Sequence, residues 1–97
     1  MRNIVIVAKV KVKEAFKDEI LNELKELHKS THALDIGVLQ YDLHQDLEDS
    51  NSFTFIETWE NQELLDAHMQ KEHFLTFVQK IDGKLENLEI TKLEKLI

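Results

Sequence analysis

The spacing of apolar residues along this chain changes repeatedly between the period of a strand and that of a helix. Valine and isoleucine dominate residues 4–12, and lysines alternate with them from Lys9 onward, as in a strand that becomes half-exposed. From Lys13 the apolar residues instead recur three or four positions apart, at Phe16, Ile20, Leu24 and Leu27. This spacing predicts an amphipathic helix of about four turns. The polar stretch 28–35 is irregular, so we expect the helix to fray there, before a turn at Gly37.

The middle of the chain has the pattern of a β-hairpin. Residues 38–43 and 53–59 are rich in aromatic, β-branched and other strand-forming side chains. The segment between them, 45–52, is polar and acidic, and Asn51 and Ser52 are typical turn residues. We therefore expect two strands joined by a turn.

A second helix and a last strand follow the hairpin. Asn61 is a suitable N-cap residue, and we expect the helix to close at Gly83. The apolar stripe of this helix changes register near residues 70–72, which predicts a bend or two segments. Residues 88–93 have the composition of a last strand.

The predicted order of elements is β-α-β-β-α-β. This order is typical of the ferredoxin-like α+β fold, in which both helices pack on one face of a four-stranded antiparallel sheet. We expect a single domain over residues 1–97, because a chain of this length accommodates one compact core. The second face of the sheet also has apolar residues, at alternating positions that include Val5, Val7 and Ile56. A second copy covers such a face most simply, so we expect a homodimer packed sheet to sheet.

Composition narrows the classes of function. The chain has 12 lysines and arginines against 19 acidic residues, a formal charge of −7, which argues against nucleic acid or an anionic membrane as a partner. It has no cysteine, which excludes disulfides, thiolate metal sites and cysteine nucleophiles. Its two glycines cannot form a glycine-rich phosphate loop. The apolar run after Met1, Arg2 and Asn3 is too short for a signal peptide or a membrane span, so we expect a cytoplasmic protein.

Five histidines raise the question of a metal site. His28 and His32 have the spacing that places two ligands on one helix face, but they lie where the helix is expected to fray and have no third ligand nearby. His68 and His73 are five residues apart, which is about 140° of rotation on a straight helix. They cannot chelate together unless the predicted bend lies between them. We therefore expect no metal, heme or flavin cofactor.

Two polar residues fall on faces that the pattern otherwise assigns to the core. His68 lies on the apolar stripe of the second helix. Glu57 lies between Phe55 and Trp59 on one face of its strand, where a carboxylate is costly unless it is paired. Each can be a satisfied core group or part of a site, since a buried imidazole titrates near neutrality and serves as a general base. Tyr41, on the neighbouring strand, can place a phenol in the same layer or close the edge of the core.

These residues carry a resemblance to a known family, the antibiotic biosynthesis monooxygenase domains, and in particular to the small stand-alone members of the quinol monooxygenase type. The resemblance covers residues 4–93, nearly the whole chain. The matching motifs are Gly37-x3-Tyr41-Asp42-Leu43, Phe53-x-Phe55-x-Glu57-x-Trp59 and Leu64-x3-His68-x4-His73-Phe74-x2-Phe77. The resemblance implies a dimeric α+β barrel and oxygenation of phenols, hydroquinones or anthrones without a cofactor. Related members break down heme or isomerise a phosphorylated sugar signal.

Departures from the family pattern limit what the resemblance implies. The usual acidic-Pro-Gly-Cys entry to the second strand is here Asp35-Ile36-Gly37-Val38, without proline or cysteine. The heme-degrading relatives use an Asn on the first strand, a Trp on the second helix and a His further along that helix. This chain has Lys9 and Lys11 in the outer part of the first strand, and its only Trp is on the third strand. We therefore expect no heme degradation.

The hypothesis is a cofactor-independent monooxygenase that uses O₂ and a small electron-rich aromatic substrate, bound in a pocket between the sheet and the second helix. We expect His68 to be the catalytic base and Glu57 to orient it. The expected substrate-binding residues are Tyr41 and His73 for substrate oxygens, and Trp59, Phe74 and Phe77 for stacking on the ring. Two alternatives stay open: an acid–base isomerase or lyase of a small phosphorylated, sugar-like signal, and a non-catalytic dimeric module that binds small molecules or serves in a stress response.

Overall fold

The computed structural model describes residues 3–97, and its elements follow the predicted order. The strands are β1 (Ile4–Val12), β2 (Val38–Gln45), β3 (Ser52–Trp59) and β4 (Leu85–Glu94). The helical elements are the 3₁₀ turn η1 (Glu14–Phe16), α1 (Lys17–Leu34), α2 (Gln62–Met69) and α3 (Glu72–Ile81). Met1 and Arg2, which entered the argument against a signal peptide, lie outside the described residues.

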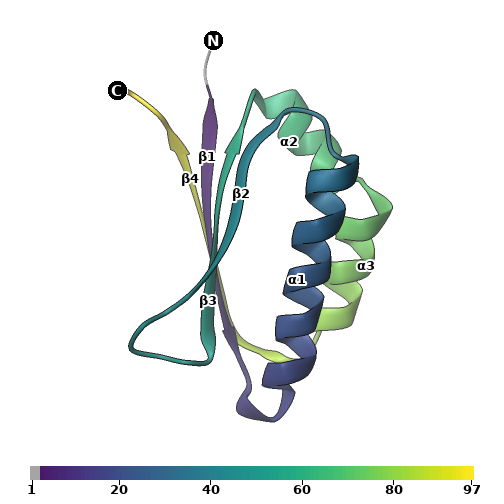
Figure 1. Cartoon of the computed structure of the whole chain (residues 1–97), viewed down its shortest axis with the longest axis vertical. Coiled ribbons are helices and arrows are strands. Elements are labelled where there is room, and N and C mark those ends of the chain that lie inside the picture. The colour runs from purple at the N-terminus through teal and green to yellow at the C-terminus, as the bar shows by residue number, and fades with distance from the viewer. Residues whose placement is uncertain (1–2) are drawn as a thin grey trace.

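The strands form one antiparallel sheet in the order β2-β3-β1-β4, and the helices cover one of its faces (Figure 1). Successive side chains of a strand point to opposite faces, so alternate residues of β1 and β3 are buried under the helices. The predicted ferredoxin-like α+β fold is confirmed. The largest fully buried side chains of the core are Trp59, Tyr41, Phe53, Ile20 and Leu24. Within residues 3–97, every helix is too short or too polar to cross a membrane.

Helix α1 is longer than the sequence pattern predicts. It runs without fraying through residues 28–34 and ends at Leu34; the backbone N–H of the C-cap residue Asp35 donates to the carbonyl of Thr31 at 3.1 Å. The expectation of an early end was wrong because Thr31 continues the buried stripe one turn after Leu27, and a buried threonine is not recognised as apolar. The last strand likewise begins earlier than expected, at Leu85.

The second predicted helix is divided at the place where its apolar stripe changes register. Helix α2 ends at Met69 and α3 begins at Glu72, so the bend expected at residues 70–72 is confirmed as a break. The predicted N-cap is also confirmed, since the side-chain oxygen of Asn61 accepts a hydrogen bond from the backbone N–H of Leu64 at 2.9 Å.

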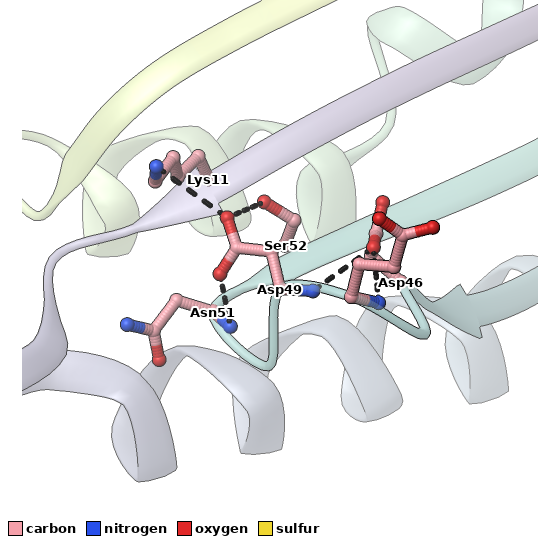
Figure 2. A network of polar contacts seen from close by, with 6 residues as sticks. Lys11, Asp46, Asp49, Asn51 and Ser52 are labelled. Atoms are coloured by element: carbon pink, nitrogen blue, oxygen red, sulfur yellow. Dashed lines mark hydrogen bonds and ion pairs between the residues drawn. The ribbon is translucent and has the colours of Figure 1, made fainter.

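The loop between β2 and β3 is held by its own acidic side chains (Figure 2). The Asp46 carboxylate accepts hydrogen bonds from the backbone N–H groups of Glu48 at 2.7 Å and Asp49 at 3.0 Å. The Asp49 carboxylate accepts from the Asn51 backbone N–H and the Ser52 hydroxyl, and these bonds lower the pKa of Asp49. It also lies 3.4 Å from Lys11 Nζ. These local bonds explain why a polar, acidic segment forms an ordered turn.

Gly37 allows α2 to approach the turn that follows α1. Its φ is +84°, and a Cβ at this position would lie 2.2 Å from Leu64 Cδ1. Its carbonyl accepts a hydrogen bond from the backbone N–H of Glu60 at 2.8 Å. The turn containing Asp35 and the start of α2 are therefore in direct contact, which positions the site described below.

Alanine substitutions at the two glycines separate backbone conformation from packing. Gly83 also has a positive φ, 75°, but an added Cβ would meet nothing within 4 Å. We expect Gly83→Ala to lower the free energy of unfolding by about 1 kcal/mol. We expect Gly37→Ala to lower it by roughly 2–4 kcal/mol, because Leu64 must also move. Urea denaturation measures both losses, and equal losses would contradict a close-packing role for Gly37.

Candidate active site

A cavity of about 260 Å³ lies between the sheet and helices α2 and α3, where the pocket was predicted. Most of its lining is apolar and comes from β1, β3, β4 and the helices. The lining includes Phe74 and Phe77, the two phenylalanines for which stacking on a substrate ring was predicted. Its polar lining residues are Tyr41, Glu57, Gln62, His68 and Lys92. Few polar groups in an otherwise apolar cavity are typical of a small-molecule site.

The sheet register places several of these residues in one row on the inner face. Tyr41 on β2 is opposite Glu57 on β3, Glu57 is opposite Ile6 on β1, and Ile6 is opposite Lys92 on β4. Since directly opposite residues share a face, the row crosses the floor of the cavity from a buried phenol to a lysine at the edge strand.

Glu57 is a buried carboxyl group whose partner is Trp59. Its Oε1 accepts a hydrogen bond from Trp59 Nε1 at 2.9 Å, and the residue is 6% exposed. Burial raises the pKa of Glu57 to about 7, although the bond from Trp59 acts in the opposite direction. We expected Glu57 to orient His68, but its hydrogen bond goes to Trp59 because both side chains lie on the inner face of β3.

Tyr41 is buried in an aromatic layer beside the cavity. Its ring centroid is 4.7 Å from that of Phe55 and 5.5 Å from that of His68. Burial raises the pKa of the Tyr41 phenol far above its ordinary value, and the nearby Glu57 carboxylate adds to the shift. The phenol therefore remains protonated and can donate a hydrogen bond to a substrate oxygen.

His68 lies in α2, and its ring is close to two aromatic side chains and to one carboxylate. Its ring centroid is 4.6 Å from Trp59 and 4.9 Å from Phe74, and its Nδ1 pairs with Asp35 Oδ2. Burial lowers the pKa of His68, although Asp35 acts in the opposite direction. The carboxylate partner assigns the ring proton to Nδ1. Nε2 is then the nitrogen left with a free electron pair.

Asp35 is the site residue that sequence reasoning missed. Its side chain is 1% exposed and lies between His68 and His73, with Oδ1 3.1 Å from His73 Nε2. Asp35 follows α1 directly and is separated from His68 by 33 positions, so no local spacing indicates the pairing. The available signal for Asp35 was its position as the acidic residue of the family motif at the entry to the second strand.

Two of the predicted substrate contacts lie outside the cavity lining. Trp59 is fully buried and packs behind His68, because it points into the core at the end of β3. His73 lines a different hollow, a groove between α1 and α3. The break after α2 brings the rings of His68 and His73 to a centroid distance of 6.1 Å, so the straight-helix argument against their convergence does not hold.

Comparison with known proteins identifies the family and supports the fold. Residues 3–80 match the family model described as Antibiotic biosynthesis monooxygenase. The chain belongs to this family. The expected ferredoxin-like architecture of the family agrees with the crystal structure of PA3566 from Pseudomonas aeruginosa, which is 32% identical with a TM-score of 0.93. That alignment covers 100% of this chain and 97% of the other.

Two sequence relatives are also similar over most of this family domain. A Bacillus subtilis protein named "Putative monooxygenase YcnE" is 34% identical over 77 residues, which are 79% of this chain and 80% of that protein. An uncharacterised Synechocystis protein is 31% identical over 93 residues, which are 96% of this chain. The chain spans 63% of the length of that Synechocystis protein. The description of the family and the name of the Bacillus subtilis protein both refer to monooxygenases.

The buried Glu57 carboxyl group predicts a pH-dependent stability. Its folded pKa of about 7 lies above the ordinary value of 4.5, so its full contribution to stability is present below pH 4.5 and is lost as the pH rises to 7. This loss corresponds to about 3 kcal/mol. Glu57→Gln can still accept from Trp59 but cannot ionise. We expect the variant to gain stability relative to the wild type between pH 4.5 and 7 in urea denaturation. Parallel pH profiles would contradict the raised pKa.

Proposed function

We propose that this protein is a cofactor-independent monooxygenase of small electron-rich aromatic compounds, with His68 as the base that removes a proton from the substrate. The observation that carries the proposal is the pairing of His68 Nδ1 with buried Asp35 at the wall of an apolar cavity. A carboxylate behind one ring nitrogen holds the imidazole in position and leaves the other nitrogen to accept a proton.

The other cavity residues have roles that suit an aromatic substrate. Phe74 and Phe77 contact the ring, and Tyr41 donates a hydrogen bond to a substrate oxygen. Asp35, which lies outside the cavity lining, replaces Glu57 as the residue that positions His68. Glu57 remains a polar group of the cavity floor, close enough in register to Tyr41 to influence it. The apolar lining favours this substrate class over a phosphorylated sugar. A phosphate group needs positively charged partners, and Lys92 is the one lysine or arginine in the lining.

The proposed reaction needs only O₂ as co-reactant. Deprotonation of a hydroquinone gives an electron-rich anion that can pass an electron to O₂, and the dry cavity keeps water from competing. One oxygen atom enters the ring and the other leaves as water, so that a hydroquinone and O₂ give a hydroxyquinone and H₂O. The four electrons lost by the substrate reduce the two oxygen atoms.

Variants of the His68–Asp35 pair test the proposal. With a panel of hydroquinones, naphthohydroquinones and anthrones, we expect O₂ uptake by the wild type and a loss of roughly 100-fold or more in His68→Gln. We expect a smaller loss, about 10-fold or more, in Asp35→Asn, because the amide holds the ring less well. His44→Gln, at an exposed histidine on β2, is the matched control and should keep full activity. A folded His68→Gln variant with full activity would contradict the proposal.

We also propose that the protein acts as a homodimer formed through the face of the sheet that the helices leave open. Val5 and Val7 on β1, Ile56 on β3 and Leu93 on β4 lie together on that face by register. A two-fold axis through this patch places the apolar side chains against their own copies, and Lys9 beside Glu89 at its margin provides charges of both signs.

Sedimentation at micromolar concentration tests the dimer. We expect a species of twice the 11.4 kDa chain mass for the wild type and a monomer for Val7→Lys, because a lysine there faces the apolar patch. Leu75→Lys, on the exposed side of α3, is the control and should remain dimeric. A wild-type monomer, or a Val7→Lys dimer, is the result that would refute this interface.

A further inference from the structure

The break between α2 and α3 brings together three side chains of the kind that bind transition metals. His68 from α2, His73 from α3 and Asp35 from the turn after α1 each offer one ligand atom. We propose that these residues form a binding site for a divalent transition-metal ion with the preferences of Zn²⁺. This inference goes beyond the proposed function and does not depend on it.

The spacing of one pair of the ligand atoms fits a small ion. The three ligand atoms lie within 4.8 Å of one another, and His73 Nε2 and Asp35 Oδ1 are 3.1 Å apart. Two ligands of one tetrahedral zinc ion, each about 2.0–2.1 Å from the metal, are about 3.3 Å apart. The spacing of the nitrogen and the oxygen is therefore close to that of two ligands on the same ion.

Two of the ligand atoms are buried and lack hydrogen bonds. Asp35 Oδ1 and His73 Nε2 are shielded from solvent, and neither has a hydrogen-bond partner within residues 3–97. Their 3.1 Å contact lacks the geometry of a hydrogen bond. Buried polar atoms without partners destabilise the folded state. A bound cation would satisfy both atoms at once.

A route for a cation leads to this cluster from the surface. His73 is 13% exposed and lines the groove between α1 and α3, which has a volume of about 410 Å³. The groove is also lined by Glu23, Glu26 and Glu72, against one lysine, Lys80. This excess of negative charge attracts cations towards the histidine that lies at the entrance.

The ligand set selects the class of metal. Two imidazole nitrogens and one carboxylate oxygen suit Zn²⁺ and neighbouring divalent ions, whereas Mg²⁺ and Ca²⁺ prefer oxygen ligands alone. Three protein ligands leave a coordination position for water.

A bound metal ion would prevent His68 from acting as a base. This consequence rests on the proposed function. An ion bound to His68 Nδ1 takes the place of the proton directed at Asp35. The neutral imidazole then carries its proton on Nε2, which can donate but cannot accept. Occupation of the site would therefore inhibit removal of a proton from the substrate.

Metal titration of the full chain, after removal of metals with a chelator and dialysis, tests the site without any substrate. Co²⁺ reports coordination through its visible absorption, and Zn²⁺ competition and calorimetry give the stoichiometry and affinity. We expect one ion per chain, and a loss of affinity of roughly 100-fold or more in His73→Gln. His73 is the residue to replace because it lies at the edge of the cluster, and circular dichroism checks that the variant folds.

The paired histidines His28 and His32 provide the matched control. Their ring centroids are 4.4 Å apart on α1, but within the described part of the chain the only three-residue metal-ligand cluster is that of Asp35, His68 and His73. The double variant His28→Gln/His32→Gln should bind Zn²⁺ like the wild type. The site is refuted if His73→Gln binds equally well, if the double variant loses binding, or if the wild type shows no saturable binding. None of these outcomes depends on whether the protein is an oxygenase.

Discussion

The burial of the Asp35 carboxylate is the constraint on which the arrangement of the helices depends. A carboxylate removed from water requires compensating partners, and within residues 3–97 the side chains that face the two oxygens of Asp35 are two imidazoles, His68 at Oδ2 and His73 at Oδ1. These imidazoles belong to different helices, α2 and α3, while Asp35 itself follows α1. One buried group therefore ties together all three long helical segments at the end of the sheet where the cavity lies. Leucines alone would pack these helices but would not determine their positions so specifically.

Two backbone features make this contact possible. The positive φ of Gly37 turns the chain back after Asp35, and the lack of a side chain there lets Leu64 pack against the turn. The break after Met69 then redirects the chain so that His73 approaches Asp35 from a second direction. A continuous helix would carry His73 away from His68. The chemistry of the site thus depends on conformations of main-chain segments that hold no functional side chain.

The fold was largely predictable because its information is local. The alternation in β1, the N-cap at Asn61 and the register change at residues 70–72 each depend on neighbours within a few positions. Glu57 and His68 could also be selected, since each is a polar residue on an apolar face. Their partners could not be predicted: Trp59 competes for Glu57 from the same strand face, and Asp35 reaches His68 across the fold. Pairing over such separations depends on how close α2 approaches the turn at Gly37, which no periodicity encodes.

The hairpin loop between β2 and β3 lies at the end of the sheet away from α2, as Figure 1 shows. Several of its backbone N–H groups and the Ser52 hydroxyl donate to Asp46 and Asp49 within the loop, and Asp49 also lies near Lys11 (Figure 2). Leu47, at its tip, is fully exposed. Such a loop is suited to carry an inserted peptide, a fluorophore or a surface tether, because the disturbance would remain remote from Asp35 and the cavity. A label attached to this loop could therefore report binding at Asp35 or in the cavity without contacting either.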